Sequence, residues 1–201
     1  MGATAEVRWF FRGQAPASLA SWFADVGAEP QERADHYLLL PETDALGIKL
    51  RGGGGPLEIK LREREHGEQQ VSGAVAGNVE QWRKWSVDLG VGEPPPDQLV
   101  VVHKSRRMVT FTPPEWKPSL EPPEPGGSDG CNAEVTDLRA GGEEWSTLGM
   151  EAFGSEDTIL ESLHSTCRAF FGTLDLPGGL GADLSCGYPG WLRQLTRTTR
   201  A

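Results

Sequence analysis

Lysine and arginine recur two residues apart in three separate segments of the chain. The pairs are Lys49 with Arg51, Lys60 with Arg62, and Lys104 with Arg106. Side chains two residues apart in a β-strand point to the same face, so each pair would place two positive charges side by side. Such rows would repel one another unless an anion or interleaved carboxylates lay among them. A polyphosphate would meet that need, because arginine and lysine donate hydrogen bonds to its oxygens.

Carboxylates occur in segments of the same kind. Glu6 and Arg8 share a face of the first predicted strand, and Glu134 and Glu151 lie in two late ones. Carboxylate and phosphate oxygens together are the ligands that Mg²⁺ and Mn²⁺ prefer. These residues therefore indicate a basic site for a phosphate-rich anion, with interleaved carboxylates and a divalent metal as a candidate cofactor. The competing interpretation is a set of solvated sheet faces, on which charged side chains discourage aggregation.

The elements that would position these residues are mostly strands. Their segments are rich in β-branched and aromatic residues or alternate in polarity, and turn-forming residues separate them. Predicted strands cover residues 5–13, 32–42, 46–52, 56–65, 98–112, 131–140 and 143–154. The four glycines at 52–55 predict a hairpin turn. Alternation in this hairpin predicts that its cations share one face and that the opposite, apolar face, which includes Ile48 and Leu61, is packed.

Helices and loops account for the rest. Apolar residues at helical spacing predict helices over 15–30, 78–90 and 156–172, the second of them packing through Val79, Trp82 and Trp85. Proline and glycine predict a long exposed loop at 113–130. The expected fold is α+β, with one antiparallel sheet domain over 1–175 and a polar tail over 176–201 packed on the same domain.

Composition excludes several classes of protein. The formal net charge of −10 argues against general affinity for nucleic acid, which depends on surface cations. No apolar run reaches the roughly 18 residues of a membrane helix, and no secretory signal pattern follows Met1, so we expect a cytoplasmic protein. The three cysteines form no CxxC pair, which argues against a disulfide framework and a thiolate zinc site. The sequence does not specify an oligomeric state.

The order of these motifs resembles the CYTH superfamily, the triphosphate tunnel metalloenzymes. The resemblance spans about residues 5–171, and the segments that carry it are GIKLRGGGGPLEIKLR, VVVHKSRRMVTF, AEVTDL and MEAFG. It implies an eight-stranded antiparallel β tunnel or barrel with flanking helices. It also implies binding of a small triphosphate-containing molecule in the tunnel, with hydrolysis assisted by Mg²⁺ or Mn²⁺.

The resemblance assigns roles to individual residues. It implies phosphate binding by Arg8, Lys49, Arg51, Lys60, Arg62, Lys104 and Arg106. It implies metal binding by Glu6, Glu134 and Glu151. Lys60 and Glu151 are the expected catalytic residues.

The sequence departs from the family pattern in two strands. Where the family has ExExK, this chain reads Glu6-Val7-Arg8-Trp9-Phe10, so that Arg8 replaces the second Glu. Thr136 stands two residues after Glu134, where a second carboxylate is frequent. Loss of carboxylates weakens metal binding more directly than phosphate binding. The alternative function is therefore a non-catalytic phosphate-binding or partner-interaction module that has lost metal ligands.

Overall fold

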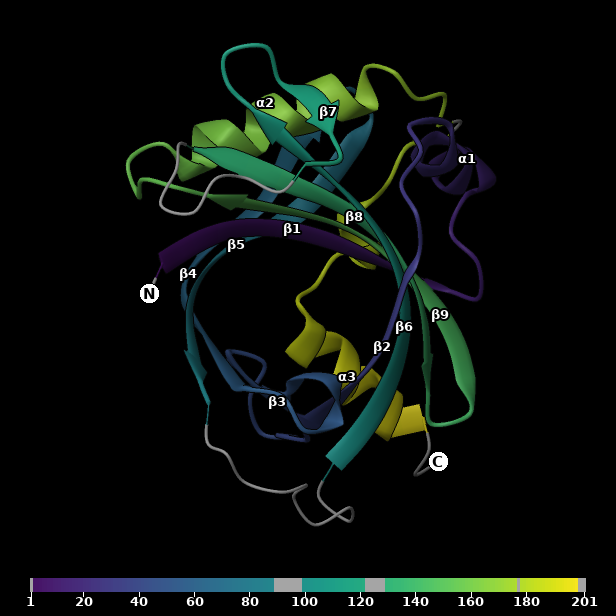
Figure 1. Ribbon diagram of the computed structural model, residues 1–201, viewed down its shortest axis with the longest axis vertical. Coiled ribbons are helices and arrows are strands. Elements are labelled where there is room, and N and C mark those ends of the chain that lie inside the picture. The colour runs from purple at the N-terminus through teal and green to yellow at the C-terminus, as the bar shows by residue number, and fades with distance from the viewer. Residues whose placement is uncertain (1, 89–98, 122–128, 177, 199–201) are drawn as a thin grey trace.

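Eight antiparallel strands close into a barrel in the computed structural model, which describes residues 2–88, 99–121, 129–176 and 178–198 (Figure 1). In barrel order they are β2 (Gln31–Leu38), β3 (Leu46–Leu50), β4 (Leu57–Ser72), β5 (Val75–Val87), β1 (Gly2–Arg12), β9 (Glu143–Phe153), β8 (Gly130–Ala140) and β6 (Leu99–Thr112). Pairing of β2 with β6 closes the ring. A short strand, β7 (Lys117–Ser119), pairs with the C-terminal end of β6, at residues 110–112. The predicted α+β fold with an eight-stranded antiparallel barrel is confirmed.

Helices cover the barrel wall and fill one end of its interior. α1 (Ala17–Asp25) packs near β6 and β8, and α2 (Ile159–Phe171) contacts β1, β4, β8 and β9. α3 (Tyr188–Thr198) lies within the ring of strands in the view of Figure 1. Two short 3₁₀ turns, Arg51–Gly53 and Ala182–Leu184, precede β4 and α3. No helix over the described ranges is both long and apolar enough to span a membrane.

The apolar core consists of two clusters on opposite sides of the barrel wall. The outer cluster packs strand residues such as Val7 and Trp9 against Phe170 and other residues of α2. The inner cluster packs Phe10 and strand residues of β6 and β8 against Trp191 and its neighbours on α3. Alternation along β1 explains this division, because odd-numbered residues face outward and even-numbered residues face the interior. The remaining interior, next to α3, is lined by charged side chains.

The helix predicted over 78–90 is wrong, because residues 78–87 belong to strand β5. Val79 is buried in the outer cluster, whereas Trp82 faces the barrel interior. Both faces of this strand are buried, so apolar residues on opposite faces fell at a spacing of three and imitated a helix. At the start of this segment, the Asn78 side-chain amide donates to the Ser185 carbonyl at 2.7 Å.

The prediction that the apolar face of the hairpin is packed is also wrong in part. Leu61 is 41% exposed, and Ile48 and Ile59 are only half-buried. The charged face of the hairpin points into the barrel, where carboxylates offset its charge, so the apolar face points outward.

The remaining elements differ from expectation in extent. The predicted strand 56–65 continues to Ser72, and the predicted helix 156–172 forms as α2, beginning at Ile159. The predicted loop 113–130 contains β7, and its residues 122–128 lie outside the described part of the chain. The predicted polar tail contains α3.

Candidate functional site

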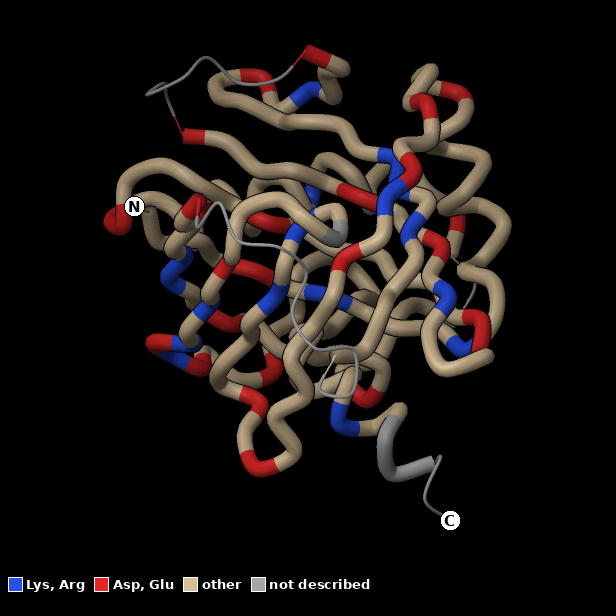
Figure 2. Tube along the Cα trace, turned by 60° about the horizontal axis from the view of Figure 1, so that its bottom comes forward, with Lys and Arg blue, Asp and Glu red and all other residues tan. Residues whose placement is uncertain are grey.

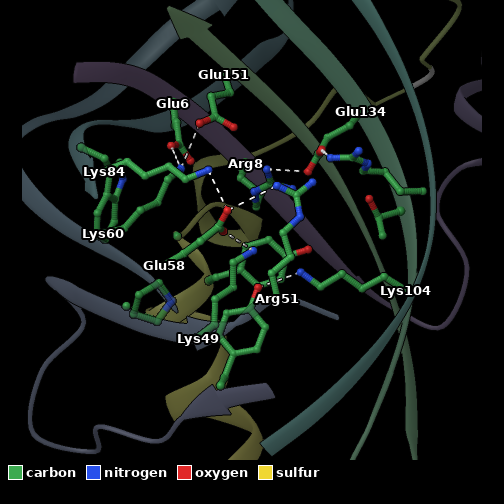
Figure 3. A pocket seen from close by; sticks show the side chains of 18 of the residues that line it. Glu6, Arg8, Lys49, Arg51, Glu58, Lys60, Lys84, Lys104, Glu134 and Glu151 are labelled. Atoms are coloured by element: carbon green, nitrogen blue, oxygen red, sulfur yellow. Dashed lines mark hydrogen bonds and ion pairs between the residues drawn. The ribbon is translucent and has the colours of Figure 1, made fainter. Parts of the chain in front are cut away.

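A charged cavity of about 130 Å³ lies inside the barrel (Figure 3). Among the described residues, eight cations line it: Arg8, Arg33, Lys49, Arg51, Lys60, Lys84, Lys104 and Arg106. The carboxylates in its lining are Glu6, Glu58, Glu134 and Glu151. Figure 2 shows basic and acidic positions close together along the strands that surround the interior. The cavity is thus more basic than acidic, although the whole chain is strongly acidic.

Of the residues predicted to form the site, all except Arg62 line this cavity. They are Glu6, Arg8, Lys49, Arg51, Lys60, Lys104, Arg106, Glu134 and Glu151. Arg62 instead lines a neighbouring pocket, where it donates to Glu80 at 2.7 Å and to Asp44 at 2.8 Å. It follows Lys60 on the same face of β4, so alternation alone did not separate the two.

One group of the cavity combines Lys60 with two carboxylates. Glu6 on β1 lies directly opposite Glu151 on β9. The Lys60 ammonium donates to Oε1 of Glu6 and, at 3.1 Å, to Oε1 of Glu151. Burial raises the pKa of Glu6 despite this ion pair, whereas Lys60 lowers the pKa of Glu151 against the effect of burial. The two carboxyl groups therefore differ in their tendency to hold a proton.

A second group is built around Glu134 on β8. Arg8 contacts Oε1 of Glu134 at 2.8 Å, and Arg106 contacts Oε2 at 3.5 Å. Although burial opposes ionisation, Arg8 and then Arg106 lower the pKa of Glu134 to about 2. The Arg8 guanidinium lies against Gly149, where an added Cβ would come within 2.5 Å of it. Both ends of this carboxylate are thus held by guanidinium groups.

A third group contains two carboxylates, Asp35 and Glu58, that are not among the residues predicted from the sequence. Asp35 on β2 is fully buried and contacts Lys104 at 3.0 Å and Lys49 at 3.1 Å. Glu58 on β4 contacts Lys49 at 3.0 Å and Lys84 at 3.1 Å. Although burial opposes ionisation, Lys104 and Lys49 lower the pKa of Asp35 below its usual value. Lys49 and Lys84 similarly lower the pKa of Glu58 to about 2.

Two tyrosines form an aromatic wall beside Lys104. The Lys104 ammonium donates to the Tyr37 hydroxyl at 2.7 Å and lies 4.1 Å from the ring centre of Tyr188. The Arg8 guanidinium lies 4.9 Å from the same Tyr188 ring. Rings in this position attract cations through their π faces, so α3 contributes directly to the site. The sequence alone did not indicate this contribution.

The carboxylates expected to bind a metal do not fit a resident divalent ion in this arrangement. Glu6 and Glu151 share the Lys60 ammonium, and both oxygens of Glu134 contact arginines. Magnesium and manganese ions need several converging oxygen ligands. Over the part of the chain that the structure describes, no group of three or more His, Cys, Asp or Glu residues is arranged to hold a metal ion. A resident ion would have to break these ion pairs.

Comparisons with known proteins identify no family. No protein-family model matches the chain, and no curated protein matches its sequence. Among solved structures, the chain is similar to the PH1819 protein from Pyrococcus horikoshii OT3, with 12% identity, 96% of this chain and 99% of that chain covered, and a TM-score of 0.43. It is also similar to HpAC1, a putative adenylyl cyclase from Hippeastrum with a dominant triphosphatase activity, with 10% identity, coverage of 86% and 87%, and a TM-score of 0.39. Both TM-scores lie below 0.5, so the function proposed below rests on the pocket itself.

Proposed function

We propose that the barrel pocket binds a small triphosphate-containing anion. The observation that carries this proposal is that eight cations and four carboxylates, counted over the described residues, line one cavity in a chain of net charge −10. Buried like charges repel strongly when they are not balanced. The carboxylates, together with buried Asp35, offset part of this positive charge, and a polyphosphate would offset the remainder.

The cations form a path from the exposed rim to the buried interior. Side-chain exposure falls from 43% at Arg51 and 36% at Lys84 to 6% at Arg8 and 2% at Lys104. A phosphate chain entering at the rim would exchange carboxylate contacts for contacts with its own oxygens at successive cations. Arginine is suited to this role because its planar donor groups contact two oxygens at once.

The proposed reaction is hydrolysis of the bound triphosphate, with Lys60 and Glu151 as catalytic residues. Water would attack the terminal phosphorus and pass its proton to the Glu151 carboxylate. The bond between that phosphorus and the bridging oxygen would break, giving orthophosphate and a leaving phosphate chain. Lys60 would stabilise the developing negative charge. Neighbouring carboxyl groups with opposite pKa shifts, as at Glu6 and Glu151, are typical of acid–base sites.

Assistance by Mg²⁺ or Mn²⁺ remains a prediction from the family resemblance. No step of the proposed reaction passes through the metal.

The second candidate function is a phosphate-binding module without catalysis. It is favoured by the ion pairs of Glu6, Glu134 and Glu151, because a carboxylate held by a lysine or arginine is a weaker base. A module of this kind would bind the anion and release no phosphate.

Thermal unfolding with millimolar sodium tripolyphosphate, followed by phosphate release from the same samples, tests both functions. Each sample is run with and without Mg²⁺ or Mn²⁺. A ligand selective for the folded state raises the unfolding temperature, so we expect a rise in the wild-type protein. Release of phosphate supports the hydrolase, and a rise without release supports the binding module. Absence of any rise would contradict both.

A matched pair of substitutions locates the binding. Lys60→Met removes a cation of the cavity, and Arg64→Met removes an exposed cation of the same strand that does not line it. We expect the tripolyphosphate response to be lost in the first variant and retained in the second. Equal responses in the two variants would show that the anion binds elsewhere.

A further inference from the structure

Arg8 and Thr136 carry buried polar atoms that lack hydrogen-bond partners and line the same cavity. The atoms are Nη1 of Arg8 and the hydroxyl oxygen of Thr136. Building on the proposed function, we propose that these two residues form a phosphoryl-oxygen site and that the pocket binds its anion without a divalent metal. The ligand class is an oligophosphate whose terminal phosphoryl group reaches the buried end of the cavity.

The Arg8 side chain is held in one position by three neighbours. Its Nη2 contacts Glu134 at 2.8 Å, its guanidinium lies 4.9 Å from the Tyr188 ring centre, and the bare backbone of Gly149 makes room for it. Only 6% of the side chain is exposed. A guanidinium fixed in this way loses little freedom on binding, which favours affinity for an oxyanion. Its Nη1 group remains available as a donor.

Thr136 lies opposite Arg106 and one row of the sheet away from the Arg8–Glu134 pair. It is directly opposite Arg106 in the pairing of β6 with β8, and it shares a face with Glu134, the partner of Arg8. The residue is 1% exposed and its hydroxyl has no partner. Buried polar groups are rarely left without a hydrogen bond, so such an atom in a cavity indicates a ligand atom or an ordered water. Opposite Arg106, in a cavity that Arg8 also lines, an anionic oxygen is the better match.

The positive charge that a metal would supply is already present in the protein. The Lys60 ammonium lies between Glu6 and Glu151, within hydrogen-bond reach of both. A divalent cation at those carboxylates would be close to this ammonium and would be repelled by it. Two departures from the family pattern, Arg8 and Thr136, replace carboxylates by groups that bind anions. The charges of Lys60, Arg8 and Arg106 thus take the place of a bound ion.

Calorimetric titration of sodium tripolyphosphate into the wild-type protein tests metal independence. One titration contains EDTA and the others contain Mg²⁺ or Mn²⁺. We expect the affinity in EDTA to equal or exceed the affinity with metal, because free metal competes for the ligand. An affinity that appears only with metal, or that rises about tenfold on its addition, would overturn this inference while leaving anion binding intact. Absence of binding in every buffer would overturn the proposed function as well.

Two variants test the assigned residues in EDTA. Thr136→Val keeps the shape of the side chain and removes its hydroxyl, and Arg8→Lys keeps the charge and removes the paired donors. Each should weaken tripolyphosphate binding by about tenfold or more, the usual effect of losing a hydrogen bond to a charged group. The control is Thr166→Val, the same change at a buried threonine of α2 that does not line the cavity. Thr136→Val removes a hydroxyl without a partner, so its unfolding temperature without ligand should stay close to wild type. If Thr136→Val binds as tightly as Thr166→Val, the phosphoryl-oxygen site is overturned.

Discussion

The Arg8 guanidinium contacts the Glu134 carboxylate at 2.8 Å and lies directly against the backbone of Gly149. The three residues come from adjacent strands, because Gly149 on β9 is opposite both Arg8 on β1 and Glu134 on β8. Glycine is the one residue that leaves room for the guanidinium at this point. The pairing of β1, β9 and β8 therefore fixes both the position and the charge of the buried end of the cavity.

Gly149→Ala should displace Arg8 and destabilise the fold. The added Cβ would meet the guanidinium at about 2.5 Å, which is too close for any side chain. Overpacking of this kind costs about 1 to 3 kcal/mol. Urea unfolding measures the change, and Gly2→Ala, at a strand glycine with open space around it, is the control. Equal stability of the two variants would mean that Arg8 does not need the space above Gly149.

Acid should destabilise the protein partly through Glu134. Its native pKa of about 2 lies below the ordinary value of 4.5, so the unfolded chain binds the proton first as the pH falls. The ion pair therefore stabilises the fold above roughly pH 4.5, and this contribution, on the order of 3 kcal/mol, is lost as the pH falls toward 2. Glu134→Gln removes the titrating group, so its stability should fall less steeply over this range. Urea unfolding at several pH values measures both curves, and parallel curves would contradict the assignment.

At neutral pH, Glu134→Gln should itself be less stable than wild type. The substitution leaves the buried Arg8 without a charged partner, and breaking a buried ion pair costs about 3 to 5 kcal/mol. Because glutamine still accepts a hydrogen bond, we expect the lower end of this range.

Lys60→Met should change how the stability of the fold depends on pH. Without the ammonium, Glu6 and Glu151 face each other as two partly buried carboxylates, and their pKa values should rise. The variant should then gain stability relative to wild type as the pH falls from about 7 to about 5, because protonation relieves the repulsion. Tripolyphosphate hydrolysis should fall by about 100-fold or more, because the ammonium that would stabilise the developing negative charge on the phosphate is lost. Full turnover in this variant would exclude Lys60 as a catalytic residue.

Trp191→Ala should release α3 from the barrel. Trp191 is fully buried, and its ring stacks on Phe10 with the ring centres 5.0 Å apart. Truncation of a buried aromatic residue costs about 3 to 5 kcal/mol. Urea unfolding provides the measurement, and Leu184→Ala, at an exposed residue before the same helix, is the control. A loss no larger than in the control would contradict the packing of α3 inside the barrel.

Strand alternation predicted much of the cavity because its period of two residues does not depend on tertiary contacts. It predicted that Lys49, Lys60 and Lys104 each share a strand face with another cation, and the family resemblance then implied that these faces line a tunnel. Alternation did not identify Lys84, because β5, the strand that carries this residue, has two buried faces and was predicted as a helix. Arg33 and Asp35 also obey the period of two, but their mixed charge resembles an ordinary solvated face.

The contribution of α3 was missed for a different reason. Tyr188, Trp191, Leu192 and Leu195 have the spacing of an amphipathic helix, which was a usable signal. The glycines and prolines around them favoured an irregular tail. The helix enters the barrel because apolar side chains of the interior, such as Phe10 and Leu138, pack against it. These side chains come together only when the sheet closes, so the sequence did not show where the helix would pack.

A crystal structure of the protein with tripolyphosphate tests the central claim most directly. We expect one phosphate chain inside the barrel, with oxygens at hydrogen-bond distance, about 3 Å, from Lys49, Lys84 and Arg8. Tripolyphosphate bound only on the outer surface at saturating concentration, with the interior ion pairs unchanged, would contradict it.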